Sequence, residues 1–224
     1  GKSSMNSKSL NYKNIINKYG ITIVLLAMIV FLSIIKPNFR TASNLLNILT
    51  QASIYGILSL GMTLVIISKG IDLSVGSTLA FTAVIAASLG QAATAANKMY
   101  PGLQTLPIIV PILAALLVGL LIGAINGALI AYTGIPAFIA TLGMMTIVRG
   151  ATYLYTDGKP VSTLIPAFKF IGQGRVLGVP MPVWIYLAMI AITWTLLSHM
   201  RFGKRTYAIS GNIHAAQVSG VNVK

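Results

Sequence analysis

Residues 71–77 read Ile-Asp-Leu-Ser-Val-Gly-Ser, and they include Asp72, one of only two acidic residues among 224. The other is Asp157, and the chain has no glutamate. Charged residues make up 8% of the chain and apolar residues 56%. A soluble domain carries about a quarter of its residues as charges. This composition indicates a membrane protein, and in a membrane a carboxylate between two apolar stretches needs a specific role.

Five or six apolar stretches approach the roughly 20 residues that a helix needs to cross a bilayer. Strands of a membrane β-barrel would instead alternate polar and apolar residues over about ten positions. The run from Ile108 to Ile122 does not alternate. We therefore predict an all-α fold, a polytopic bundle of about six membrane helices. The predicted spans are 21–35, 52–68, 75–96, 106–132, 135–155 and 180–198.

The 16 basic residues give a net charge of +14. They are scattered in short runs with no single basic face, which argues against a nucleic-acid partner. Four lysines precede the first span, and Arg201, Lys204 and Arg205 follow the last, a bias typical of the inner side of a membrane. We expect a cytoplasmic N-terminus (1–19), a transmembrane domain (20–200) and a cytoplasmic segment (201–224).

Several helix boundaries are predicted from local signals. Ser43 is expected to cap a short interfacial helix over 44–51. Gly70 is expected to take a left-handed conformation after the second span. Asp72 or Ser74 is expected to cap the next helix, and binding of an ion or substrate by Asp72 is the alternative.

Further boundaries come from proline and glycine. Pro107 and Pro111 suggest a tilt or kink at the start of the fourth span. The stretch 156–180 contains Asp-Gly, Gly-Gln-Gly and three prolines, which predicts a long outer loop.

Inside the fourth span, Gly119, Gly123 and Gly127 share one face, which predicts close approach of another helix. Asn126 lies beside that face and is expected either to hydrogen-bond between helices or to line a path. With two histidines, no cysteine and no glutamate, the sequence predicts no catalytic residues and no metal site. No carboxylate or histidine sits mid-span, which argues against proton coupling.

The phosphate-binding pattern Gly-x4-Gly-Lys-Ser/Thr is missing from the 224 residues. Energy for transport is therefore expected from another chain, and passive flow is the alternative. After the last span, Ser210-Gly211-Asn212 offers a cap, residues 213–219 can form about two helical turns, and Gly220 can end them. This short helix suits insertion into a partner's groove, and an ordinary interfacial helix is the alternative.

Four stretches, which together span most of residues 20–224, resemble the permease subunits of bacterial ATP-binding-cassette importers for monosaccharides of the ribose and galactose type. They are Asn47-Ile-Leu-Thr-Gln51 with Gly61-Met-Thr-Leu-Val-Ile66, Gly70-Ile-Asp-Leu-Ser-Val-Gly-Ser77, Pro136-Ala-Phe-Ile-Ala-Thr-Leu-Gly143 with Arg149-Gly150, and Arg201-Phe-Gly-Lys204 with Tyr207-Ala-Ile209 and the residues from Gly211 to Gly220.

The resemblance implies a permease of the cobalamin-importer kind in the bacterial inner membrane. It implies a second permease subunit, identical or not, a periplasmic sugar-binding protein and a cytoplasmic ATPase. ATP and Mg would bind to that ATPase, and this chain would hold no cofactor. The implied function is ATP-driven monosaccharide import, and a passive sugar pore is the alternative.

The resemblance also assigns residues. The implied ATPase-coupling residues are Gly211, Asn212, Ala215, Ala216, Ser219 and Gly220. Gly70, Asp72, Ser74 and Gly76 match a structural motif of the family, and Asn126 and Thr141 are candidates for the sugar path.

Three departures from the family stand out. Ser210 stands where the family usually has glycine, and a positive φ there would cost about 1 kcal/mol. Lys69 stands where a small or hydroxyl residue is usual. Family members also continue through further spans after the coupling segment, so we expect this chain to be a truncated permease.

Overall fold

The computed structural model describes residues 5–223, with side chains from residue 16 onward. It divides into two compact units, one up to Leu49 and one from Thr50. The first unit contains α1 (Met5–Ile35), the 3-10 helix η1 (Pro37–Arg40) and the start of α2 (Ala42–Ile67). Residues 1–4 of the predicted cytoplasmic segment lie outside the described part. The apolar part of α1, Ile16–Ile35, agrees with the first predicted span.

The start of α2 corrects two expectations. The hydroxyl of Thr41, not that of Ser43, accepts the backbone N–H of Asn44, at 3.3 Å. No separate helix over 44–51 exists, because α2 continues without interruption to Ile67. No glycine or proline lies between residues 41 and 55 to stop the helix.

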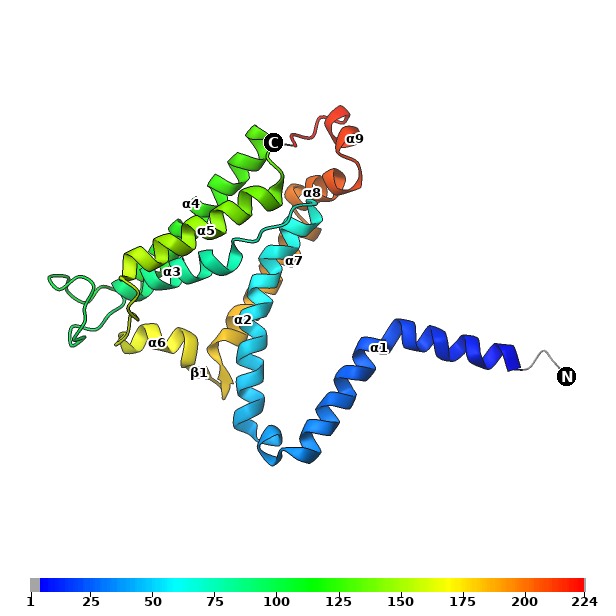
Figure 1. Ribbon diagram of the computed structural model, residues 1–224, viewed down its shortest axis with the longest axis horizontal. Coiled ribbons are helices and arrows are strands. Elements are labelled where there is room, and N and C mark those ends of the chain that lie inside the picture. The colour runs from blue at the N-terminus through cyan, green and yellow to red at the C-terminus, as the bar shows by residue number, and fades with distance from the viewer. Residues whose placement is uncertain (1–4, 224) are drawn as a thin grey trace. The chain divides into compact units, whose positions relative to one another are not determined.

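The second unit holds the rest of the chain (Figure 1). After α2 come α3 (Val75–Leu89), α4 (Ile109–Thr133), α5 (Ala137–Thr156), α6 (Pro166–Gln173), strands β1 (Arg175–Val176) and β2 (Val179–Pro180), α7 (Met181–Ser198), α8 (Arg201–Gly211) and α9 (Ile213–Val218). In the described part, α1, α2, α4, α5 and α7 are long and apolar enough to cross a membrane. The predicted span 75–96 is shorter, because α3 ends at Leu89, before Gly90.

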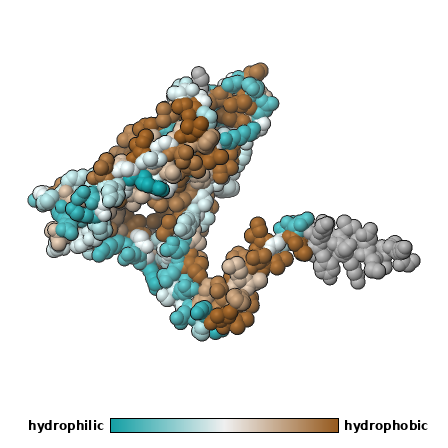
Figure 2. All heavy atoms as spheres, viewed as in Figure 1, coloured by the Kyte–Doolittle hydropathy of each residue, from teal (hydrophilic) through white to brown (hydrophobic). Residues whose placement is uncertain are grey.

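Helix α3 packs against both α4 and α5. Ile122, Met144 and Val148 form the buried core of this group, with Phe81 and Val118 packed on it. Most other apolar side chains of these helices are exposed, as expected for a surface that faces lipid. Figure 2 shows hydrophobic residues along the helices and hydrophilic residues gathered at their ends.

The prolines at the start of α4 do not interrupt it. The helix begins at Ile109, after Pro107, and Pro111 falls in its first turn. An N–H in the first turn has no partner within the helix, so a proline there breaks no helical hydrogen bond.

The stretch 156–180 is not one open loop, which corrects the prediction for it. It contains α6 and a hairpin whose turn residues, Leu177 and Gly178, both have positive φ, as tight hairpin turns require.

Gln91, only 2% exposed, connects two loops through its side chain. Its Nε2 donates to the carbonyls of Asn97 (3.2 Å) and Ser162 (3.1 Å), and its Oε1 accepts the N–H of Met99 (2.8 Å).

Helix α2 ends in a left-handed residue, but that residue is Lys69 (φ 61°) and not Gly70. The N–H of Gly70 donates to Val65 O, and that of Lys69 donates to Ile66 O, both at 2.9 Å. This is the bonding pattern of a Schellman end, in which the left-handed position is usually glycine. A β-carbon on Gly70 would lie 3.1 Å from Val65 Cγ1, so Gly70 is favoured there by close packing.

Helices α2 and α7 meet closely at one glycine. A β-carbon on Gly56 would lie 2.5 Å from the ring of Tyr186 on α7. No real β-carbon approaches another atom that closely, so the contact depends on glycine. Gly61 on the same helix has no such neighbour within 4 Å.

We expect Gly56→Ala to destabilise the protein, because the new methyl group forces the Tyr186 ring to move, and overpacking typically costs about 1–3 kcal/mol. Gly61→Ala is the matched control, and its higher helix propensity should leave stability unchanged or raise it. Thermal unfolding in detergent measures both. Equal melting temperatures for the two variants would show that the contact does not matter.

We expect Lys69→Gly to stabilise the protein by about 1 kcal/mol, because glycine removes the strain of a β-carbon at positive φ. Lys69→Ala removes the same charge but keeps the β-carbon, so it should give no such gain. The measurement is again thermal unfolding. A gain of equal size in the alanine variant would assign the effect to the lysine charge instead.

Candidate functional site

Residues 68–74 are not helical and connect α2 to α3. The depth of this segment along α4 can be estimated from one contact. Asn126, which hydrogen-bonds Ser74 of the segment, lies seven residues before the end of α4. At 1.5 Å per residue, that contact is about 10 Å inside the helix. Backbone groups away from water at such a depth need hydrogen-bond partners within the protein.

Thr141 on α5 supplies partners for this segment. Its hydroxyl accepts the N–H of Leu73 (3.1 Å) and points its own hydrogen toward the carbonyls of Ile71 (3.1 Å) and Ala137 (2.8 Å). The side chain is only 2% exposed. Thr141 was predicted as a candidate for the sugar path, and its contacts give it a structural role, since it fixes the extended segment to α5.

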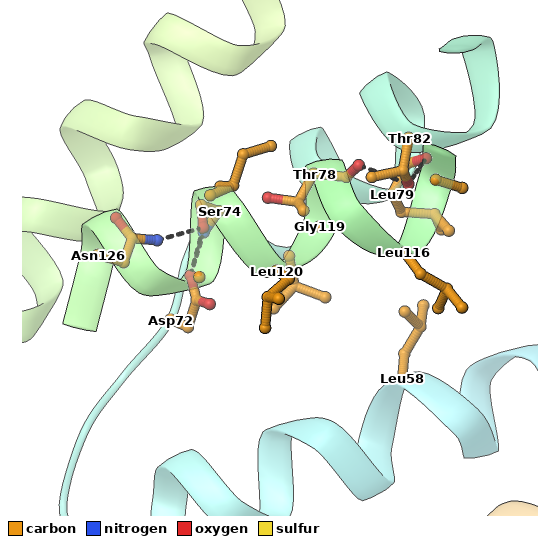
Figure 3. Close-up of a pocket in the computed structure, with 14 residues that line it drawn as sticks. Leu58, Asp72, Ser74, Thr78, Leu79, Thr82, Leu116, Gly119, Leu120 and Asn126 are labelled. Atoms are coloured by element: carbon orange, nitrogen blue, oxygen red, sulfur yellow. Dashed lines mark hydrogen bonds between the residues drawn. The ribbon is translucent and has the colours of Figure 1, made fainter. Parts of the chain in front are cut away.

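Asp72, Ser74 and Asn126 form a second connection, this time to α4 (Figure 3). Asp72 Oδ1 accepts both the N–H (2.8 Å) and the hydroxyl (2.6 Å) of Ser74. Ser74 Oγ in turn accepts a hydrogen bond from Asn126 Nδ2 at 3.0 Å. A carboxylate, a hydroxyl and an amide from two separate segments are thereby joined.

The predicted cap of α3 takes an unusual form. Ser74 is the N-cap residue, but its side chain accepts no helix N–H. The carboxylate of Asp72 bonds the N–H of Ser74 itself, one position before the helix. Asp72 therefore fixes the approach to α3 and does not satisfy the free N–H groups of its first turn.

A cavity of about 520 Å³ lies beside this network. This volume is within the range of small-molecule sites. Its polar lining is formed by Asp72, Ser74, Thr78, Thr82 and Asn126. Apolar residues and glycines of α3 and α4, with Leu58 of α2, complete it (Figure 3). Asn126 Oδ1 and Thr78 Oγ1 are buried and have no hydrogen-bond partner in the described part of the chain.

The chemistry available in this cavity is hydrogen bonding. A carboxylate oxygen and an amide oxygen accept hydrogen bonds, and a threonine hydroxyl can both donate and accept. Unpartnered polar atoms beside an apolar wall suit a small ligand that carries hydroxyl groups. Among the described residues, no three histidine, cysteine or acidic side chains gather as a metal site would require.

The predicted glycine face on α4 is only partly covered. A β-carbon on Gly119 would contact Thr82 Cγ2 of α3 at 3.6 Å. Gly123 and Gly127 have no such neighbour within 4 Å. Gly119 and Gly123 instead line the cavity, so their small size keeps it open. Gly76, one of the four residues that match the family's structural motif, is the second residue of α3. A β-carbon on Gly76 would also have no neighbour within 4 Å.

The predicted coupling segment folds as α8 and α9. Asn212 caps α9, since its Oδ1 accepts the N–H groups of His214 (3.0 Å) and Ala215 (3.1 Å). Gly220 ends it with a φ of 78°. The other predicted residues differ in exposure: Gly211 ends α8, Ala215 and Ser219 are exposed, and Ala216 is 5% exposed.

Ser210 lies inside α8 and is not among the residues with positive φ. The strain considered for serine at this position is therefore absent from the structure.

Gly203 is a structural residue that sequence reasoning did not single out. A β-carbon on it would lie 2.0 Å from the backbone oxygen of Leu197. The first turn of α8 thus packs directly on the backbone at the end of α7. The only sequence signal was a glycine one turn after a span end, and that signal does not reveal the contact.

Comparison with known proteins agrees with this architecture. The family model described as branched-chain amino acid transport system / permease component matches residues 44–224. The ribose import permease protein of Haemophilus influenzae is 43% identical over 205 residues, which cover 90% of this chain and 60% of that protein. The ribose import permease protein of Bacillus subtilis is 39% identical, covering 96% of this chain and 64% of the relative.

The galactose/methyl galactoside import permease protein of Escherichia coli is 40% identical over 229 residues, which cover 99% of this chain and 67% of that protein. No solved structure matches the chain significantly.

The chain spans about 60% of the length of the Haemophilus relative. With its apolar helices, it is a multi-pass protein of the bacterial inner membrane. The chain belongs to the family of branched-chain amino acid transport system permease components.

Proposed function

We propose that this chain is a membrane-spanning permease component that carries a monosaccharide, such as ribose or galactose, into the cell in an ATP-driven importer. The observation that carries this proposal is about 40% identity to proteins named as ribose and galactose/methyl galactoside import permeases, over 90% or more of the chain. Those relatives are named as import permeases, which favours this function over a passive sugar pore.

The chain would act without catalysis of its own. A separate cytoplasmic ATPase would bind ATP and Mg, a periplasmic protein would deliver the sugar, and a second permease subunit would complete the path. The chain's 224 residues contain no Gly-x4-Gly-Lys-Ser/Thr stretch, which supports an external source of energy.

The cavity beside Asp72 is the part of the sugar path that we propose for this chain. Ser74 engages Asp72 Oδ1, which leaves the second carboxylate oxygen for a ligand. Hydroxyl groups of a sugar could donate to that oxygen and to Asn126 Oδ1, which lacks a partner among the described residues. A carboxylate acceptor gives charge-assisted hydrogen bonds, which are about twice as strong as neutral ones.

Movement would reach this cavity from α9. Closure of the ATPase subunits would displace α9, and the tight α7–α8 corner at Gly203 would pass the displacement to α7. The change in which side the cavity faces is then a shift between two conformations that the ATPase biases.

We expect Asn126→Ala and Asp72→Asn to lower sugar uptake about tenfold or more, the loss expected for a hydrogen bond to a charged or buried group. Thr146→Ala is the control, because the Thr146 hydroxyl bonds Leu142 O of its own helix and does not line the cavity. The assay is uptake of labelled ribose and galactose into proteoliposomes that contain the ATPase and the binding protein. Normal uptake by the Asn126 variant would remove this cavity from the path.

We expect Ala215→Glu together with Val218→Glu to abolish binding of the cognate ATPase. Both residues are exposed on α9, and Val218 is 91% exposed, so the change adds charge to a docking face without disturbing the core. Leu177→Glu is the matched control, because Leu177 is 88% exposed in the β1–β2 turn. Co-purification in detergent is the measurement. Retention of the ATPase by the α9 variant would contradict the docking assignment.

A further inference from the structure

A second cavity, of about 560 Å³, lies between α3 and α5. The α3 residues that line it are Gly76, Ser77, Ala80 and Val84, whereas Ser74, Val75, Thr78, Leu79 and Thr82 line the first cavity. The two cavities therefore lie against different faces of α3. We call the second one the Arg149 groove, after the basic residue on its α5 wall.

Arg149 is a charged residue inside a membrane-spanning helix. It lies seven residues before Thr156, the last residue of α5, or about 10 Å from that end. Its side chain is exposed and lines the groove. A guanidinium remains charged at any physiological pH, so at this depth it requires a compensating group.

The two carboxylates of this sequence are both engaged elsewhere. Asp72 accepts two hydrogen bonds from Ser74. Asp157 pairs with Lys159 at 2.8 Å. Among the described residues, neither carboxylate pairs with Arg149, so its guanidinium is open to an anionic ligand.

Two further groups define the chemistry of the groove. Lys159 lines it just beyond the end of α5, where it also pairs with Asp157. Ser77 is 5% exposed, lines the groove, and has an Oγ without a hydrogen-bond partner in the described part of the chain. Ala80, Val84 and Val161 supply an aliphatic wall beside these polar groups.

We propose that the Arg149 groove binds the phosphodiester headgroup of an anionic phospholipid. The planar guanidinium matches two phosphate oxygens at once. The Ser77 hydroxyl can donate to an ester oxygen of the same lipid, and an acyl chain can lie along the aliphatic wall. Soluble phosphate offers the same oxygens, but it has no acyl chain to lie along the aliphatic wall. This site is independent of sugar import.

The test is a titration of the detergent-purified chain with phosphatidylglycerol and with phosphatidylcholine of the same acyl composition, followed by native mass spectrometry. We expect tighter binding of phosphatidylglycerol, because the choline ammonium is repelled by the Arg149 guanidinium. Arg149→Gln should weaken phosphatidylglycerol binding about tenfold, the effect of one lost hydrogen bond to a charged group. Lys169→Gln is the matched control, because Lys169 is an exposed cation on α6 that does not line the groove, and it should change nothing.

Three results would overturn the proposal: equal binding of the two lipids, unchanged binding by Arg149→Gln, or loss of the lipid on addition of millimolar inorganic phosphate. If Arg149→Gln does not fold, Lys159→Gln decides. Lys159 is 72% exposed in a loop, so its replacement should leave the fold intact and weaken phosphatidylglycerol binding severalfold. Binding by Lys159→Gln equal to that of the unchanged chain would then refute the site.

Discussion

The hydrogen bonds that hold residues 71–74 inside the membrane are the constraint on which the rest of the structure depends. A non-helical segment cannot face lipid, because its backbone N–H and C=O groups would have no partners there. Thr141 satisfies two of these groups from α5, and Asn126 reaches the segment from α4 through Ser74. Three helices are thereby joined at one short stretch of extended chain.

This arrangement explains why cavities lie against two faces of α3. The helix follows the extended stretch directly and spans only 15 residues, Val75–Leu89, because it ends before Gly90. Small residues on α3 and α4, such as Gly76, Gly119 and Gly123, leave space beside it. The buried polar residues of the linker therefore lie next to empty volume, which is where ligand recognition is possible.

The sequence predicted the features that depend on local signals. Apolar length located four of the spans to within about five residues, but it placed the start of α2 ten residues late and the end of α3 seven residues late. Asn212 and Gly220 correctly marked the limits of α9. Where a feature depends on tertiary contacts, its prediction was wrong or the feature was missed. Lys69 takes the left-handed position because Gly70 is needed for close packing on Val65, and no local pattern distinguishes the two.

The same distinction between local signals and tertiary contacts holds for the candidate site. The unusual carboxylate at Asp72 and the amide of Asn126 were visible in the sequence as polar groups in apolar surroundings. Their connection through Ser74, and the structural role of Thr141, join residues 52 to 70 positions apart and could not be seen locally. Gly203 belongs to the same class, because only the path of α8 across the end of α7 makes a side chain impossible there.

The α7–α8 corner also limits how this protein can move. A hinge needs residues that can change φ and ψ without a clash, and Gly203 is packed against the backbone of Leu197. The corner is therefore a rigid connection and not a hinge, and a force applied to α8 is transmitted to α7. Helix α7 contacts α2 through Tyr186 and Gly56, and α2 leads directly into the extended segment at Asp72. The α8–α9 end is thus connected to the polar network through the α7–α8 corner, the contact of Tyr186 with Gly56, and the chain that runs from α2 into residues 71–74.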